Sequence, residues 1–147
     1  MPRSRKTERD RRRSPSAARH ADTIRLALME TAPAGLKKPR LMVVTELSGS
    51  QIVRGLAAYR ELAGEKQWPP LVWSWEEGYH FCEDADELEA WERQWAEVKY
   101  TQISSVITGV LDPHERLFPK SRWLAYVIAQ MNAIQSALDM IAHPQPQ

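Results

Sequence analysis

The sequence predicts a mainly α-helical fold with one small β-hairpin, and three observations lead to this prediction. Apolar residues recur at spacings of three and four over most of the chain, as they do on one face of a helix. Two short runs at 71–75 and 79–82, rich in aromatic and β-branched residues, flank a loop that ends in Gly78. The pattern over about 121–142 is long and regular. The 147 residues suffice for a domain with a core of its own.

The charge is distributed unevenly along the chain. Residues 1–19 carry eight Arg or Lys against Glu8 and Asp10, a net charge of +6, and residues 83–97 carry seven acids against Arg93, a net charge of −6. The total of only +1 hides this polarity. Since residues 1–19 contain almost no large apolar groups, we expect a disordered basic arm there. It would serve either as a solubilising tail or as an arm that contacts phosphates.

Three helices are predicted between residues 20 and 64. The first covers 21–31, and the second covers 39–47 with Pro39 at its first position. The third begins after Ser48, which can N-cap a helix while Gln51 reaches back to close a capping box. The order is helix, short helix, tight turn and capped helix, which is the layout of a helix-turn-helix.

A β-hairpin is predicted directly after these helices, with Glu76, Glu77 and Gly78 as its loop. A lone hairpin is marginally stable, so its aromatic residues are expected to pack on the helices rather than to line a ligand pocket. These aromatics are Trp73, Trp75, Tyr79 and Phe81. A hairpin in this position is a wing, so residues 20–82 are assigned to a winged helix-turn-helix domain. The two acids at its tip would repel phosphates.

Two longer helices are predicted over residues 83–110 and about 121–142, with a proline-containing connector at 111–119. The last helix carries an apolar seam over almost three heptads. The seam consists of Leu124, Val127, Met131, Ile134, Leu138 and Ile141. We expect it to pair with a second copy of the chain, so 83–142 is assigned as a helical dimerisation region and 143–147 as a disordered tail. The alternative is a helical hairpin within one chain.

The candidate DNA-binding residues lie at the starts of the second and third helices. Ser50, Gln51 and Arg54 stand off the buried stripe of the third helix and are assigned to base reading. A second group is assigned to phosphate binding, and it consists of Lys37, Lys38, Arg40 and Ser48. The expected partner is double-stranded DNA, bound by a homodimer.

Other classes of function find little support. The four histidines are scattered without the spacing of metal ligands, no glycine loop cradles a phosphate, and the acids of 83–97 lack convergent partners. We therefore expect no enzyme, no cofactor and no metal. One cysteine, Cys82, and the lack of an apolar run of membrane-spanning length favour a cytoplasmic, nucleoid-associated protein. The alternative is a protein–protein adaptor whose acidic helix and apolar seam bind a second protein.

The stretch LSGSQIVRGLAAYREL, followed by PLVWSWEEGYHFC, resembles the winged helix-turn-helix superfamily. With two helices after the wing, the chain is similar in plan to PadR-type regulators. The stretch GYHFCEDADELEAWERQWAEVKYTQI also resembles the RacP-type proteins of actinobacterial mobile elements and phages. The first resemblance implies a dimer with two recognition helices in successive major grooves and a role in transcription. The second implies a role in the maintenance, replication or excision of a mobile element. The acidic wing tip departs from the superfamily pattern.

Overall fold

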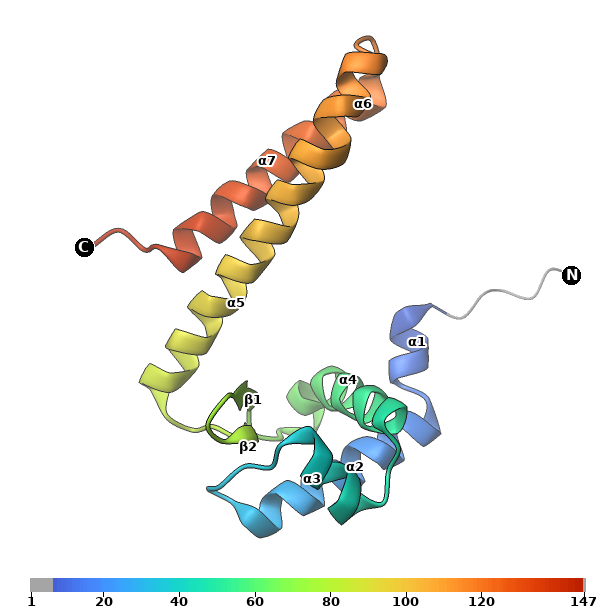
Figure 1. Ribbon diagram of the computed structural model, residues 1–147, viewed down its shortest axis with the longest axis vertical. Helices are drawn as coiled ribbons and strands as arrows, with labels where there is room; N and C mark the ends of the chain where they lie inside the picture. Colours follow the sequence, from blue (N-terminus) through green and yellow to red (C-terminus); the bar gives the residue numbers. More distant parts are fainter. Residues whose placement is uncertain (1–6, 147) are drawn as a thin grey trace, which may run out of the picture. The chain divides into compact units, whose positions relative to one another are not determined.

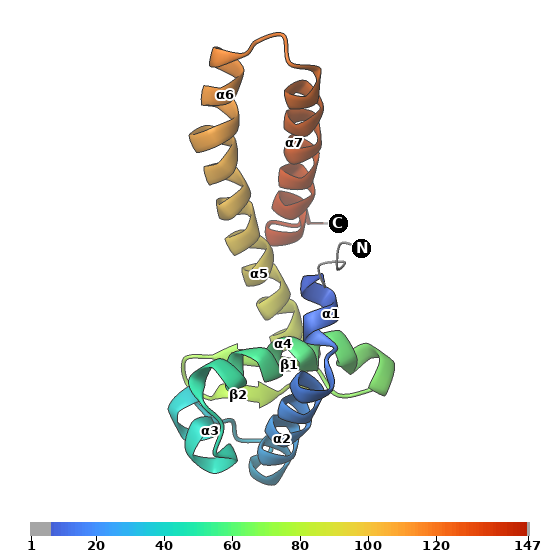
Figure 2. The ribbon, with the colours of Figure 1, turned by 90° about the vertical axis from the view of Figure 1, so that its right-hand side faces the viewer.

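The computed structural model describes residues 7–146 and divides the chain into two compact units, Met1–Asp84 and Ala85–Gln147. The predicted fold class is confirmed, because helices dominate both views in Figures 1 and 2 and the sheet is one antiparallel pair of strands. The boundary between the units falls two residues after the predicted one. We call the two parts unit 1 and unit 2.

Unit 1 contains four helices and two strands within the described residues. They are α1 (Glu8–Arg12), α2 (Pro15–Thr31), α3 (Lys38–Thr45), α4 (Gly49–Lys66), β1 (Leu71–Ser74) and β2 (Gly78–Phe81). The predicted helix-turn-helix corresponds to α3 and α4. The turn between them contains Glu46 in the left-handed region, with φ of 56°, and Ser48 then caps α4.

The expectation of a disordered arm is wrong for residues 7–19, which are largely helical; residues 1–6 lie outside the described part of the chain. Thr7 caps α1 and forms a capping box with Asp10, and the Ser14 hydroxyl caps α2 by accepting a hydrogen bond from the Ala17 amide. Ala17 itself is buried against α4. The reason for the error is that local capping and one small core residue order a segment that the charge density alone predicts to be unfolded.

The core of unit 1 lies mainly between α2 and α4. Its larger cluster consists of Ile24, Ala27, Leu28, Leu41 and Ile52, and a second cluster consists of Ala17, Ala21, Ala58 and Tyr59. The small residues let the two helices approach closely. At Gly55 a Cβ atom would lie only 2.6 Å from Ile24 Cδ1 and 3.1 Å from the backbone of His20, so a larger residue here would displace the Ile24 side chain and press on the backbone of α2.

The hairpin pairs Leu71 with Phe81 through to Ser74 with Gly78, so the turn consists of residues 75–77. Tyr79 and Phe81 pack on the helices as predicted, and Tyr59 of α4 stacks on Phe81 at a ring-centroid distance of 6.0 Å. The same expectation is wrong for Trp75, which is 81% exposed because it belongs to the turn, and Trp73 is also exposed, at 37%. Val72 and His80 on one face are buried and Leu71 and Phe81 on the other are half-buried, whereas the end of the hairpin near the turn is exposed.

Unit 2 is a helical hairpin. Its elements are α5 (Ala85–Val106), the π-helical turn η1 (Ile107–Leu111), α6 (Asp112–Leu117) and α7 (Arg122–Ala142). Figure 2 shows α7 running back alongside α5. The predicted connector is wrong over 111–117, which is helical. Pro113 has no N–H to donate to a helical hydrogen bond. The wide π turn η1 lies directly before it, and the helix continues past the proline as α6.

The apolar seam of α7 is divided rather than used as one surface. Leu124 and Leu138 are buried within the single chain, whereas Ile134 is 46% and Ile141 49% exposed. Gln135 lies between the two buried leucines and donates a hydrogen bond to Ser104 Oγ of α5, at 2.6 Å. The hairpin within one chain is thus present, and the assignment of Leu124 and Leu138 to a dimer interface is corrected because α5 covers them.

Within residues 7–146, no helix is both long and apolar enough to cross a membrane.

Candidate nucleic-acid interface

The first turn of α4 is closed by the predicted capping box. Ser48 Oγ accepts a hydrogen bond from the Gln51 amide at 3.3 Å, and Gln51 Oε1 accepts one from the Ser48 amide at 2.8 Å. Ser50 Oγ lies 3.2 Å from Ser48 Oγ. The side-chain carbonyl oxygen of Gln51 is therefore engaged in the cap. Its side-chain amide nitrogen remains as the group that can contact another molecule.

The exposed face of α4 begins with Ser50 and continues one turn later with Arg54. Val53, between them, is 55% exposed and belongs to the same face. Sequence reasoning missed Val53, although its position off the buried stripe of Ile52 and Leu56 was the signal that could have found it. A methyl group of Val53 can contact the methyl group of thymine, and the guanidinium of Arg54 can donate two hydrogen bonds to guanine.

The predicted phosphate-binding cations gather at the start of α3. Lys37 is the N-cap residue, Lys38 begins the helix, and Lys37 and Arg40 are exposed. The side chain of Lys38 extends toward the start of α4, because a Cβ atom at Gly49 would lie 3.8 Å from Lys38 Nζ. Lys38 therefore brings a positive charge from the start of α3 to the N-terminus of α4.

None of these basic side chains is neutralised inside the described part of the chain. Lys37, Lys38, Arg40 and Arg54 form no ion pair with an acid of residues 7–146. By contrast, other exposed arginines in unit 1, among them Arg13 with Glu65 at 2.6 Å, do form such pairs. The side chains at the two helix starts are thus available to an anionic partner.

The hairpin tip does not add cations to this region. Glu77 Oε2 accepts a hydrogen bond from the Gly35 amide at 3.3 Å, and the Glu77 amide donates to Ser74 Oγ at 3.1 Å. Gly78 follows with φ of 71°, and a Cβ atom there would lie 2.6 Å from the Leu36 carbonyl oxygen. Glu77 therefore ties the tip to the segment before α3, which accounts for one of the two acids. Glu76 remains exposed.

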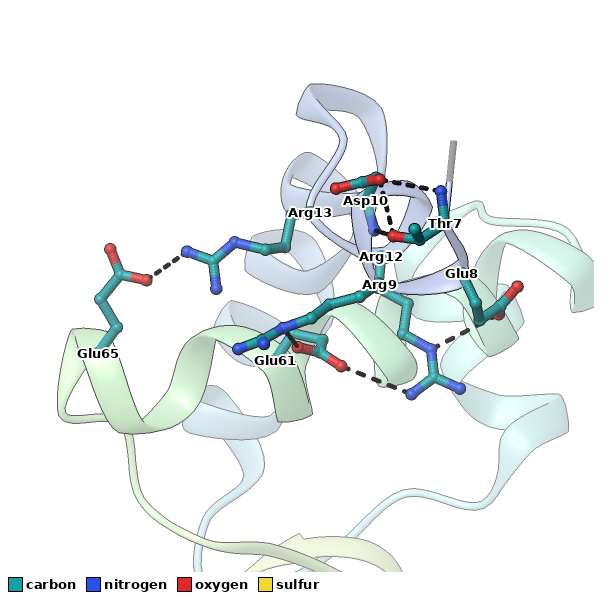
Figure 3. Close-up of polar contacts among 8 residues, drawn as sticks. All are labelled: Thr7, Glu8, Arg9, Asp10, Arg12, Arg13, Glu61 and Glu65. Carbon is teal, nitrogen blue, oxygen red and sulfur yellow. Dashed lines mark hydrogen bonds and ion pairs between the residues drawn. The ribbon is translucent and has the colours of Figure 1, made fainter. Parts of the chain in front are cut away.

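A second basic region, on α1, was not predicted as part of the site. Arg9, Arg12 and Arg13 lie over the C-terminal half of α4, where they face Glu61 and Glu65 (Figure 3). The signal in the sequence was the capping pattern that begins at Thr7, which marks a short helix. Because α1 is ordered on α4, its arginines have defined positions along the candidate recognition helix.

Tyr59 anchors the far end of α4. Its ring stacks on Trp68 at a centroid distance of 5.1 Å, and its hydroxyl donates a hydrogen bond to the Pro69 carbonyl oxygen. Burial raises the pKa of Tyr59 to about 12, and the positive charge of Arg25 lowers that pKa in part. The residue keeps α4 and the segment that leads to the hairpin in a fixed arrangement, and it takes no part in the exposed face.

No protein-family model, curated protein or solved structure matches this chain. The function of the region is therefore inferred from its chemistry.

Proposed function

We propose that the protein binds double-stranded DNA sequence-specifically as a homodimer, and acts as a transcriptional regulator or as an accessory factor of a mobile element or phage. One observation carries the proposal. The first turns of α4 present Ser50, Val53 and Arg54 to solvent, directly after a tight turn and beside the unpaired cations of α3. A capped helix placed in this way is the reading element of helix-turn-helix proteins. The mobile-element role rests on the resemblance of the sequence alone.

The proposed contacts follow from the side chains. Arg54 donates two hydrogen bonds to guanine, Val53 contacts a thymine methyl group, and Ser50 bonds a neighbouring base edge. Gln51 contributes through its amide nitrogen only, because its oxygen belongs to the cap. The phosphate-binding group consists of Lys37, Lys38, Arg40 and Ser48. Phosphate contacts set the position of α4 on the duplex, and the base contacts discriminate between sequences.

The proposed homodimer rests on the composition of α7. Of its 21 residues only Arg122 and Asp139 are charged, and within the chain α5 and η1 pack against it. Large apolar side chains remain exposed on its other sides, namely Trp123, Tyr126, Ile134, Met140 and Ile141. A helix that is apolar on most of its surface is normally buried. Val127, Ile134 and Ile141 recur every seven residues beside the α5-facing side, so a second copy packed there would form a four-helix bundle.

A protein–protein adaptor is the second candidate. Trp73 and Trp75 form an exposed edge-to-face pair with a centroid distance of 4.7 Å at a hairpin tip that also bears Glu76. The first turn of α5 is acidic, through Asp86 and Glu87. The exposed tryptophans beside Glu76 suit a basic protein partner better than a phosphate backbone, and the acids of α5 would give unit 2 a basic partner of its own. On this alternative, alanine at Lys38 or Arg54 would leave function intact.

Affinity measurements on two duplexes test the proposal, one with the preferred sequence and one with the same bases scrambled. Arg54→Ala is expected to lose about 10- to 100-fold on the preferred duplex and much less on the scrambled one, because it removes a base contact. Arg60→Ala is the matched control, since Arg60 is also an exposed α4 arginine without an ion pair in the described residues but lies almost two helical turns beyond Arg54.

Lys38→Ala is expected to weaken binding to both duplexes similarly and to reduce the salt dependence by about one phosphate contact. An equal loss on both duplexes for Arg54→Ala would remove that residue from base reading. Unchanged affinity for all three variants would favour the adaptor.

A further inference from the structure

The short helix α1 lies on the same side of α4 as the proposed reading residues. Glu61 is seven residues after Arg54 and Glu65 is eleven, which correspond to about two and three helical turns. Both glutamates therefore share a face with Arg54, but they belong to the C-terminal half of α4. The surface that would approach DNA thus has reading residues at one end and an acid-bound arginine helix at the other.

The contacts between α1 and α4 are ionic (Figure 3). Arg9 Nε lies 3.4 Å from Glu61 Oε2, Arg12 Nη1 lies 3.6 Å from Glu61 Oε1, and Arg13 Nη2 lies 2.6 Å from Glu65 Oε2. Glu61 is the least exposed partner, at 20% of its side chain, whereas Arg9 is 76% exposed. Each guanidinium has further N–H donors that these contacts leave unused.

Apolar packing contributes little to the position of α1. The helix has five residues and none of them is buried. Ion pairs at an exposed surface are individually weak and are screened by salt. A strong competing anion can therefore displace the two carboxylates without disturbing the core of unit 1. Arg12 also pairs with Glu8 of α1 itself, at 3.6 Å, so three guanidinium groups face three carboxylates in this cluster.

We propose that α1 is a latch whose arginines exchange between two acceptors, the glutamates of α4 in the free protein and the phosphates of duplex DNA in the complex. This inference rests on the proposed function. A duplex presents one negative charge per about 1.7 Å of its axis and releases counterions on contact, and phosphate accepts two hydrogen bonds from one guanidinium. Arg9, Arg12 and Arg13 then hold the backbone next to the groove that receives the first turns of α4.

The latch has a consequence for selectivity. Glu61 and Glu65 compete with every phosphate backbone, whatever its sequence, so they lower the affinity for all duplexes by a similar factor. A complex with a wrong sequence lacks the base contacts of Arg54 and is left with the weakened phosphate contacts alone. The glutamates therefore limit occupancy of random DNA, which is the excess competitor in a genome.

The decisive variant is Glu61→Gln/Glu65→Gln, compared with Glu30→Gln/Glu83→Gln. Both double variants change the net charge equally, and Glu30 and Glu83 are exposed acids that form no ion pair in the described residues. Dissociation constants for a random duplex are measured at several salt concentrations. The latch predicts that the first variant binds about fivefold tighter than the control variant. It also predicts a steeper salt dependence of the affinity for the first variant. In the wild type, the glutamates that the arginines leave take up salt cations, which offsets part of the counterion release from DNA, whereas glutamine takes up none.

A second comparison assigns the gain to α1. In the Glu61→Gln/Glu65→Gln background, further replacement of Arg9, Arg12 and Arg13 by Gln is expected to abolish the gain in affinity. Arg19 is an exposed arginine of α2 outside the cluster, and Arg19→Gln in the same background is expected to leave most of the gain. If the gain survives the triple replacement, α1 is not its source and the latch is wrong.

The remaining outcomes separate the two proposals. If the double variant binds random duplex as the control variant does, or more weakly, the latch is wrong while DNA binding stands. If the wild type and both double variants fail to bind any duplex, the proposed function falls and the latch falls with it.

Discussion

The two units of the chain bury their apolar residues to very different extents. In unit 1 the stripes of α2, α3 and α4 meet one another, and Ile24, Leu28, Leu41 and Ile52 are almost fully inaccessible. In unit 2 only four of the described apolar residues are buried, and these are Ala96, Leu111, Leu124 and Leu138. Meanwhile α7 leaves Trp123 and Met140 about 70% exposed. Unit 1 thus has partners for its apolar residues within the chain, whereas unit 2 has more apolar surface than two helices can cover.

This difference indicates how each unit is stabilised. The stability of unit 1 is expected to be intrinsic and independent of protein concentration. That of unit 2 is expected to depend on concentration, because a second copy supplies part of its core.

A truncation in the core of unit 1 is expected to have the largest effect. Leu28→Ala removes a side chain that is 1% exposed and should lower the free energy of unfolding of unit 1 by about 2–5 kcal/mol. Hydrogen exchange resolved by residue measures this loss for each unit separately. The loss should appear in unit 1 at every protein concentration. A loss that shrinks as concentration rises would contradict the intrinsic stability of unit 1.

A charge on the exposed stripe of α7 is expected to separate the chains. Ile134→Asp places an unpaired carboxylate in the proposed interface and should raise the dimer dissociation constant by at least about a hundredfold. Sedimentation then gives the mass of one chain. Ser136→Asp is the matched control, because it adds the same charge on an exposed position away from that stripe. The same mass for wild type and Ile134→Asp would overturn the assignment.

Tyr59 is expected to make unit 1 sensitive to alkaline pH. Its pKa is about 12 in the folded protein against 10 in the unfolded chain, because burial disfavours the charged phenolate. The unfolded chain therefore loses this proton first. The stabilisation is fully present below pH 10 and declines between pH 10 and 12, by on the order of 2 kcal/mol. Tyr59→Phe should flatten this decline in unfolding measurements across the range, and a decline of equal size in the variant would exclude Tyr59 as its cause.

The cap of α4 is expected to contribute the smallest effect. Ser48→Ala removes the hydroxyl that accepts from the Gln51 amide and should cost unit 1 about 1 kcal/mol. Ser50→Ala leaves that hydrogen bond intact and should cost much less. Denaturant unfolding compares the two variants. Equal losses would mean that the capping box adds no stability to the helix that carries the reading residues.

The regular parts of unit 1 were predictable because local signals and tertiary packing agree there. The capping box of Ser48 and Gln51, Pro39 near the start of α3 and the glycine at the hairpin turn each specify one local conformation. Ser50 and Arg54 were predictable as exposed residues for the same reason, since they lie off the stripe that begins at Ile52.

The parts that were missed depend on contacts far apart in the sequence. Residues 7–19 are ordered by the caps at Thr7 and Ser14 and also by long-range contacts, namely the ion pairs to Glu61 and Glu65 and the burial of Ala17, which the charge density of the segment does not reveal. The exposure of Trp75 follows from a shift of the hairpin turn by one residue. The division of the α7 seam follows from the partner that α5 provides, and periodicity alone does not specify a partner.

The central claim, that the first turns of α4 read DNA, is tested most directly by selection of bound duplexes from a random pool, with wild type and Arg54→Ala in parallel. Wild type is expected to enrich a two-fold symmetric motif, with half-sites about one helical turn or a multiple of it apart, and Arg54→Ala is expected to lose one position of each half-site. If wild type enriches no motif, or if the variant enriches the same motif at full strength, α4 does not read the sequence and the account is wrong.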